Sequence, residues 1–356
     1  MPIFTQEELK DAAFRVFRAA GALPESASAV AEALVAANLA GIDSHGVQRI
    51  PQYVGWMEQG RVTVNPRIQI VRETEVFAVI DGDWGFGQVV ARRATDVAIE
   101  KASRTGVGVV SVGDCCHIGR VGDYPLRVAE RGMIGILFAN SHGAGRFVAP
   151  WGGIERRLSA NPVSIAIPRS AAPPILADVS TCAIAEGKVR SLLNKKLELP
   201  ANCVIDAEGH PSTNPNVLYG PPEGALLPFG GHKGFALGLV IDILAGALSG
   251  AGCSRPDSDR PGNGFLLIAI DIARFREKSA FNADVEQLIE YVNSSKLAPG
   301  FSEILTPGEP EIRESERRER NGIPVDEETW RQIVSTAKRY NLTISQPDQF
   351  QRRSSK

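Results

Sequence analysis

The N-terminal part of the chain has the apolar periodicity of amphipathic helices. Thr5-Gln-Glu-Glu8 has the residues of a capping box, and apolar residues then recur three and four positions apart from Leu9 to Phe17. An alanine-rich run, Glu25 to Leu39, follows Pro24 and ends at Gly41. A third helix is predicted over Val47–Gln59. This part of the chain is therefore predicted to form a helical lobe.

From Val76 the pattern changes to short β-branched runs separated by helical segments. This alternation is typical of an α/β fold. Helices are predicted over Gln88–Ser103 and Leu126–Arg131, and strands at Val76–Ile80, Val107–Val112, Ile134–Ala139, Val163–Ile167, Ile175–Val179 and Phe265–Ile270. The links around residues 140–175 are too short for helical crossovers, so some strands are expected to be antiparallel. The prediction is an α/β fold with a mixed sheet.

The C-terminal half adds two predicted helices. Phe235 to Gly252 is strongly apolar, but it contains Asp242 and is short for a bilayer span, so it is interpreted as a buried helix. Asp326 to Leu342 is amphipathic, and the tail after Gln346 is polar and expected to fray. We predict a helical lobe of residues 1–72, joined by 310–356, and a sheet domain of residues 73–309.

Composition narrows the range of partners. The 356 residues are 43% hydrophobic and carry a formal charge of −2, without the basic excess that binding to a phosphate backbone requires. The start of the chain has no basic segment followed by an apolar one, so no signal peptide is predicted. The odd number of five cysteines favours packing thiols in a reducing compartment. We expect a cytoplasmic protein with no nucleic-acid or membrane partner and no metal.

The segment Asp43-Ser-His-Gly-Val-Gln-Arg49 holds the first candidate chemistry. If the turn stays helical, His45 and Arg49 lie on one face, four residues apart. A guanidinium can hold a carboxylate in bidentate fashion, and an imidazole can move a proton near neutral pH. This combination suits a small anionic substrate. The alternative is a histidine at a helix end beside a surface arginine.

Two further histidines follow predicted strands. His117, in Cys116-His-Ile-Gly-Arg-Val-Gly122, comes after one strand, and His142 comes after the next. The carboxyl ends of strands are where α/β sheets commonly place their sites. His117 is therefore a second imidazole candidate, and His142 is expected to face the same cleft.

No Gly-x-Gly-x-x-Gly element is present, so the sequence does not support a Rossmann fold. A different glycine-rich element, Pro228-Phe-Gly-Gly-His-Lys-Gly234, precedes the long apolar helix. Its glycines let backbone amides approach a ligand, and Lys233 adds positive charge beside a helix N-terminus. The element suits phosphate or carboxylate, and the alternative is a solvated turn with a surface lysine.

Together these segments resemble the malate/L-lactate dehydrogenase type 2 family over nearly the whole chain. This family includes sulfolactate, ureidoglycolate and diketogulonate oxidoreductases and cyclic imine reductases. The resemblance rests on motifs in a fixed order: DSHGVQR at 43–49, HIGRVGDY at 117–124, PWGG at 150–153, SANP at 159–162, DVST at 178–181, PFGGHKG at 228–234, AIDIARF at 269–275 and PGE at 307–309.

The resemblance implies a non-Rossmann mixed sheet that binds NAD or NADP, an N-terminal helical lobe and a homodimer. It implies that a small 2-hydroxy acid and its 2-oxo acid are interconverted by hydride transfer to and from the nicotinamide. His45 and Ser44 match the family's Ser-His pair, His117 matches a histidine given the acid/base role in other members, and Arg49 matches the carboxylate binder. The implied cofactor contacts are Ser141, Asp178, Val179, Ser180, His232, Lys233, Pro307, Gly308 and Glu309. We rank His45 above His117 as the acid/base residue.

Departures from the family pattern bear on the substrate. Ala160 replaces a threonine, and Lys188 stands where the imine reductases carry an aspartate, which argues against imine reduction. Cyclic imine reduction and an inactive dinucleotide-binding protein are the alternatives. A serine hydrolase is disfavoured because adjacent residues such as Ser44 and His45 are expected to point apart and because no Gly-x-Ser-x-Gly is present. Arg120 and Arg146 are candidates for contact with a 2′-phosphate.

Overall fold

A seven-stranded mixed sheet forms the centre of the molecule in the computed structural model, which describes residues 1–194, 196–258 and 260–344. Only β3 and β4 run parallel, and every other neighbouring pair is antiparallel. This confirms the predicted α/β class and mixed sheet. In spatial order the strands are β2 (Gln69–Glu73), β3 (Phe77–Asp81), β4 (Val107–Cys115), β11 (Asn263–Asp271), β5 (Met133–Ala139), β6 (Val163–Ile167) and β7 (Ile175–Val179).

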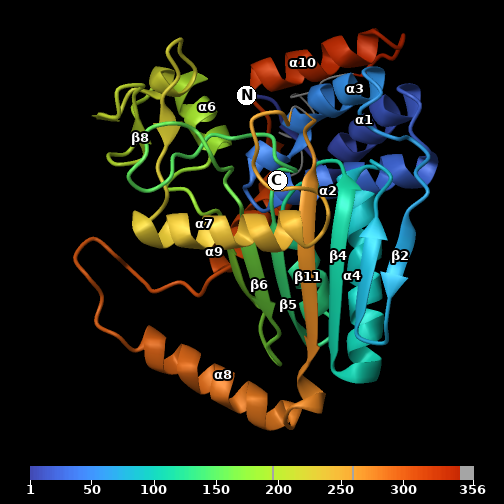
Figure 1. Ribbon diagram of the computed structural model, residues 1–356, viewed down its shortest axis with the longest axis vertical. Helices are drawn as coiled ribbons and strands as arrows, with labels where there is room; N and C mark the ends of the chain where they lie inside the picture. The colour runs from blue at the N-terminus through green and yellow to red at the C-terminus, as the bar shows by residue number, and fades with distance from the viewer. Residues whose placement is uncertain (195, 259, 345–356) are drawn as a thin grey trace, which may run out of the picture.

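Helices cover both faces of this sheet (Figure 1). α4 (Gly87–Thr105) and α5 (Asp123–Ala129) pack on one face, and α7 (His232–Asp242) lies across the other, where Ile241 contacts the core near Val163. α4 approaches β4 closely because Gly108 has no side chain: a Cβ there would lie 2.1 Å from the Ala98 carbonyl oxygen. The apolar central strands are therefore buried between two layers of helices.

The N-terminal helices form a second core together with the C-terminal helix. α1 (Gln6–Ala19), α2 (Pro24–Leu39) and α3 (Ile50–Glu58) pack with α10 (Glu327–Lys338), which lies over them in Figure 1. β1 (Ile3–Phe4) also pairs with β12 (Ile323–Pro324). The capping box at α1 is present as predicted, since the Thr5 hydroxyl accepts from Glu8 N and the Glu8 carboxylate accepts from Thr5 N.

The predicted division at residue 72 falls inside β2, and the division into two domains stays a prediction. The predicted frayed tail after residue 346 lies outside the described residues. The sequence analysis missed several elements. These are the strands β1, β2 and β12, a small three-stranded sheet of β8 (Val204–Ile205), β9 (Pro211–Ser212) and β10 (Ala225–Leu226), and the helices α6 (Glu186–Asn194), α8 (Lys278–Asn293) and α9 (Glu309–Asn321).

The prediction that residues 235–252 form a buried helix is wrong in part. α7 continues into a π-helical turn (Ile243–Ala247), and only one face of it meets the sheet. Val240 and Ile243 are each 50% exposed on the opposite face. In the part of the chain that is described, no helix is both long and apolar enough to cross a membrane.

Candidate active site

The Asp43–Arg49 segment forms two 3-10 turns, Asp43–His45 and Val47–Arg49, rather than the continuous helix that the spacing suggested. Gly46 between them has an extended backbone. The break has a local cause in the buried side chain of Asn38, which accepts a hydrogen bond from Val47 N at 2.8 Å and donates to Asp43 Oδ1 at 2.6 Å. A Cβ on Gly46 would lie 2.2 Å from Asn38 Oδ1, so only glycine fits beside this amide.

Ser44 and His45 turn toward each other, and the expectation that they point apart is wrong. Ser44 Oγ lies 3.0 Å from His45 Nδ1. Arg49 closes the same turn, since its Nε donates to Ser44 O at 2.6 Å. The site therefore begins as one compact unit of serine, histidine and arginine.

Arg49 keeps part of its guanidinium available. Its NH1 donates to Gln52 Oε1 at 2.8 Å, and within the described part of the chain its NH2 has no hydrogen-bond partner. The side chain is held at Nε and NH1, so it is fixed before any ligand arrives. An arginine held in this way suits recognition of a carboxylate.

The fold places the ring of His117 on that of His45, so the two candidate imidazoles lie in one site. The two rings stack with centroids 5.4 Å apart and an interplanar angle of 19°. Burial, together with the charges of Arg49 and Arg120, lowers the pKa of His45 to about 4. Burial, with Arg49 and His45, also holds the pKa of His117 well below its ordinary value. Both imidazoles are therefore neutral near pH 7.

Sequence reasoning missed two residues behind His117. The Tyr53 hydroxyl lies 2.6 Å from His117 Nδ1, and Gln88 Nε2 donates to the same hydroxyl at 3.1 Å. Both side chains are buried. Tyr53 lies four residues after Arg49 on the next helix, and this spacing was the only signal that could have linked it to the site.

His142 is not part of the histidine stack. Its Nε2 lies 3.1 Å from Asp114 Oδ1, and its ring packs against Trp84 with centroids 4.6 Å apart. Its backbone is in the left-handed region, with φ of 53°. The structure thus gives His142 partners other than His45 and His117, and the expectation of a shared cleft stays a prediction.

Most of the residues named as cofactor contacts come from segments that the fold brings together. The Asp178–Ser180 segment leads into Thr181, whose carbonyl oxygen accepts from Phe229 N at 3.0 Å, so it abuts the glycine-rich loop that carries His232 and Lys233. Pro307 O accepts from Leu176 N at 2.9 Å, which places the 307–309 turn beside β7. Ser141 lies in the turn after β5 and accepts from Ala144 N at 3.0 Å.

The two arginines considered for a 2′-phosphate are both engaged within the chain. Arg120 is buried, its NH1 lies 3.2 Å from Asp123 Oδ1, and its Nε lies 4.0 Å from Asp178 Oδ2. Arg146 NH1 donates to the carbonyl oxygen of Gly143 at 3.0 Å, and its NH2 donates to that of Pro256 at 3.3 Å. Each arginine therefore has a structural role that the sequence did not indicate.

The candidate imine-reductase position lies next to the Ser44 turn. A Cβ on Gly187 would lie 2.8 Å from Ser44 Cβ, so the start of α6 packs directly on this turn. Lys188 follows Gly187 and is exposed. An ammonium group here cannot accept the hydrogen bond that an aspartate would accept.

Comparison with known proteins adds the family context. The model of the malate/L-lactate dehydrogenase family matches residues 4–334. The chain is 37% identical to L-sulfolactate dehydrogenase of Methanocaldococcus jannaschii over 96% of this chain and 98% of the relative. It is 38% identical to malate dehydrogenase of Pyrococcus horikoshii over 92% of each protein.

Solved structures agree with these sequence matches. The sulfolactate dehydrogenase structure from M. jannaschii superposes with a TM-score of 0.86 at 36% identity, covering 96% of this chain and 98% of that one. A delta1-piperideine-2-carboxylate reductase from Pseudomonas syringae superposes with a TM-score of 0.81 at 28% identity, covering 95% and 100%. The fold is therefore shared by a sulfolactate dehydrogenase and by a delta1-piperideine-2-carboxylate reductase.

Proposed function

The chain belongs to the malate/L-lactate dehydrogenase family, and on that premise we propose that it interconverts a small 2-hydroxy acid and its 2-oxo acid with NAD or NADP. The observation that carries this proposal is the stacked pair of His45 and His117 beside Arg49. Two neutral imidazoles and one fixed guanidinium are the groups that such a reaction needs from the protein. They act on the substrate oxygen and the substrate carboxylate.

The reaction follows from the protonation states of these side chains. Arg49 binds the carboxylate through its available guanidinium nitrogen and fixes the carbon next to it. A neutral imidazole accepts the hydroxyl proton during oxidation and returns it during reduction. His45 is our first choice for this step, since its Nδ1 is engaged with Ser44 and its Nε2 is the remaining nitrogen.

The residues of the glycine-rich loop fit a dinucleotide. Gly230 and Gly231 have φ of 55° and 63°, and a Cβ on Gly234 would lie 2.4 Å from Phe229 O. The backbone can therefore come close to a ligand at the start of α7, where helix N–H groups favour an anion and the exposed Lys233 adds positive charge. When bound, the nicotinamide exchanges a hydride with the substrate carbon.

Cyclic imine reduction is the second candidate, because a piperideine-carboxylate reductase shares this fold. Lys188 argues against it, since this lysine stands where the imine reductases carry an aspartate. An inactive dinucleotide-binding protein is the third. The joint presence of His45, Arg49 and His117 in one site argues against loss of catalysis.

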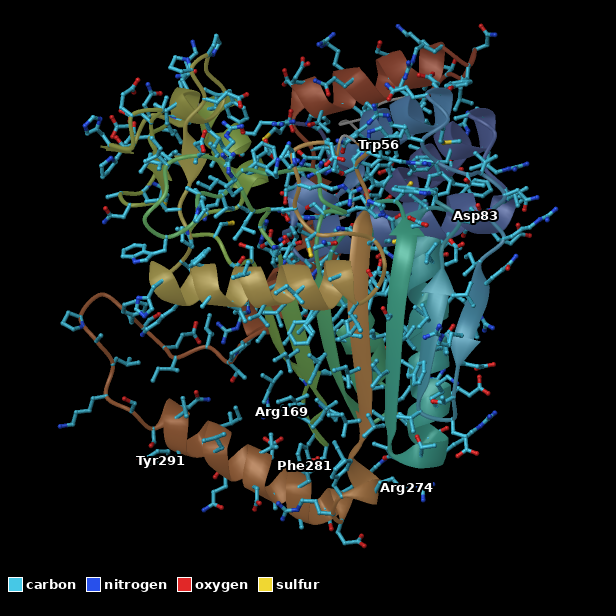
Figure 2. The ribbon with its side chains drawn as sticks, in the orientation of Figure 1. Trp56, Asp83, Arg169, Arg274, Phe281 and Tyr291 are labelled. Carbon is cyan, nitrogen blue, oxygen red and sulfur yellow. The ribbon has the colours of Figure 1, made fainter. Side chains whose placement is uncertain are left out.

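We also propose that the protein is a homodimer. α8 has no buried residue and stands away from the sheet in Figure 1. It is tied to the sheet by the ion pair of Glu286 with Arg169, and Figure 2 labels Arg169 between the sheet and this helix. Leu288 and Tyr291 on α8 are 59% and 76% exposed. A second copy would cover this apolar surface and that of α7. Sedimentation should give a dimer that Tyr291→Glu weakens, and a monomeric wild type would contradict this proposal.

The test of the function is a panel of acceptors with NADH and NADPH. Pyruvate, oxaloacetate, sulfopyruvate and piperideine-2-carboxylate are each offered while nicotinamide absorbance is followed. Reduction of at least one 2-oxo acid, and not of the imine, is the expected result. Turnover of the imine alone would favour the second candidate. A change in NADH fluorescence without any turnover would favour the inactive binding protein.

A further inference from the structure

A buried hydrogen-bonded chain ends on the ring of His117. It runs from Gln88 Nε2 to the Tyr53 hydroxyl at 3.1 Å and from that hydroxyl to His117 Nδ1 at 2.6 Å. Tyr53 is 2% exposed and Gln88 is 1% exposed, so water does not compete for these bonds. The sequence analysis and the family resemblance gave neither residue a role.

The direction of these hydrogen bonds follows from which groups can donate a proton. An amide nitrogen donates and does not accept, so Gln88 Nε2 gives its hydrogen to the Tyr53 oxygen. Burial raises the pKa of Tyr53 to about 12, so the phenol keeps its proton. Among the described residues His117 Nδ1 is the acceptor within reach of that proton, and a buried hydroxyl left without an acceptor would be costly. The one proton of neutral His117 then lies on Nε2.

We propose that Tyr53 and Gln88 are positioning residues that hold His117 with its proton on Nε2, so that His117 donates a hydrogen bond to the C2 oxygen of the substrate while His45 exchanges the proton. This proposal rests on the proposed dehydrogenase function. It gives the stacked histidines different tasks, because His45 is held at Nδ1 by Ser44 and not by a tyrosine.

The proposed step balances. In oxidation the substrate O–H bond breaks and its proton passes to His45 Nε2. The C2–H bond breaks with its electron pair, which leaves as hydride for the oxidised nicotinamide, and the C2–O double bond forms. His117 keeps its proton throughout and supports the negative charge that develops on the oxygen.

If these hydrogen bonds ran in the opposite direction, His117 would carry its proton on the other ring nitrogen. If the Gln88 amide were turned so that Oε1 accepted from Tyr53, the phenol oxygen would accept from His117, and the imidazole proton would lie on Nδ1. His117 would then offer Nε2 as a base. The two arrangements differ in the protonated ring nitrogen, which can be measured directly.

The first experiment is ¹⁵N NMR of the histidine rings in the uniformly labelled full chain at pH 7. We expect His117, assigned through the loss of its signals in His117→Gln, to show protonated Nε2 and unprotonated Nδ1. Tyr53→Phe should produce a mixture of tautomers, whereas Tyr124→Phe, which removes another buried hydroxyl, should not. A proton on Nδ1 in the wild type would overturn the proposal. This readout does not require activity, so it stands apart from failure of the proposed function.

The second experiment uses turnover of the 2-oxo acid that the panel identifies. A glutamine side chain can donate a hydrogen bond but cannot take up a proton. His117→Gln should therefore retain at least tenfold more kcat than His117→Ala, while His45→Gln and His45→Ala should be equally poor. Tyr53→Phe should lower kcat by about tenfold with KM nearly unchanged, and should have no further effect in a His117→Gln background. Equal loss in His117→Gln and His117→Ala would overturn the assignment.

Discussion

The guanidinium of Arg318 on α9 contacts the carboxylate of Asp43, with NH1 at 2.6 Å from Oδ1 and NH2 at 3.1 Å from Oδ2. Arg318 NH1 also donates to the backbone oxygen of Asn38 at 2.7 Å, and the arginine is only 7% exposed. A residue near the end of the described chain thus holds the start of the turn that carries Ser44 and His45.

Arg318→Ala should loosen this turn. The substitution removes the charged hydrogen bonds that this buried arginine donates to Asp43 and to the Asn38 carbonyl, so the free energy of unfolding should fall by about 2–3 kcal/mol. Urea denaturation measures the change. Arg317→Ala, which removes an exposed ion pair with Glu314 on the same helix, is the matched control and should change stability by less than about 1 kcal/mol. Equal effects of the two variants would contradict the anchoring role.

Gly46→Ala should destabilise the protein and impair activity together. The new Cβ would overlap the Asn38 amide, and relief requires a shift of Asn38 that costs about 1–3 kcal/mol. Gly55→Ala on α3 is the control, because no atom lies within 4 Å of its Cβ position, and this change should be neutral or stabilising by up to about 1 kcal/mol. Thermal unfolding measures the stability of both variants, and NADH-dependent assays measure their activity.

His45→Ala should lose more activity than His117→Ala. Removal of a general acid/base typically costs ~10²–10⁴-fold in turnover. Steady-state kcat for both variants, with folding checked by circular dichroism, measures the order. A greater loss in His117→Ala would show that His117 carries the proton.

Arg49→Lys should reduce substrate affinity although it keeps the charge. Lysine cannot reproduce the bond from Nε to Ser44 O together with a free nitrogen for the substrate carboxylate. We expect kcat/KM to fall by about 10- to 100-fold, mostly through KM. Gln52→Ala, which removes only the contact with NH1, should have a smaller effect. An unchanged KM in Arg49→Lys would show that the carboxylate is bound elsewhere.

Stability should fall as the pH is lowered from 6.5 toward 4, in part because of His45. Its folded pKa of about 4 lies below the ordinary value of about 6.5, so in this window the unfolded chain binds a proton that the folded protein does not. The contribution between pH 7 and pH 5 is about 2 kcal/mol. Burial raises the pKa of Asp123 to about 6, which acts in the opposite direction.

His45→Asn isolates the histidine contribution, since Asp123 titrates in both proteins. Urea midpoints at pH 7 and pH 5 should show a larger loss for the wild type than for the variant. An identical loss in both would mean that His45 is protonated in the folded protein at pH 5.

The local pattern of apolar and polar residues was enough to predict most strands of the central sheet and the helices with strong periodicity. The capping box at Thr5, the strand at Val163–Ile167 and the strand at Ile175–Val179 are found as predicted. Short strands such as Val204–Ile205 were missed because two residues are too few to show a period. The helix Lys278–Asn293 was missed although Phe281, Val285, Leu288, Ile289 and Val292 recur at helical spacing. The ordered motifs also identified the family without any knowledge of contacts.

The sequence by itself determined the fold class, the family and the segment that carries His45 and Arg49. Tertiary structure alone decided that His45 stacks on His117, that Tyr53 and Gln88 lie behind that ring, and that Arg318 holds Asp43. The physical reason is the distance along the sequence between the residues that interact. Helix and strand periodicity depends on neighbours a few residues away, whereas these contacts join segments whose distance is set by sheet register and by the packing of the helical lobe against the sheet.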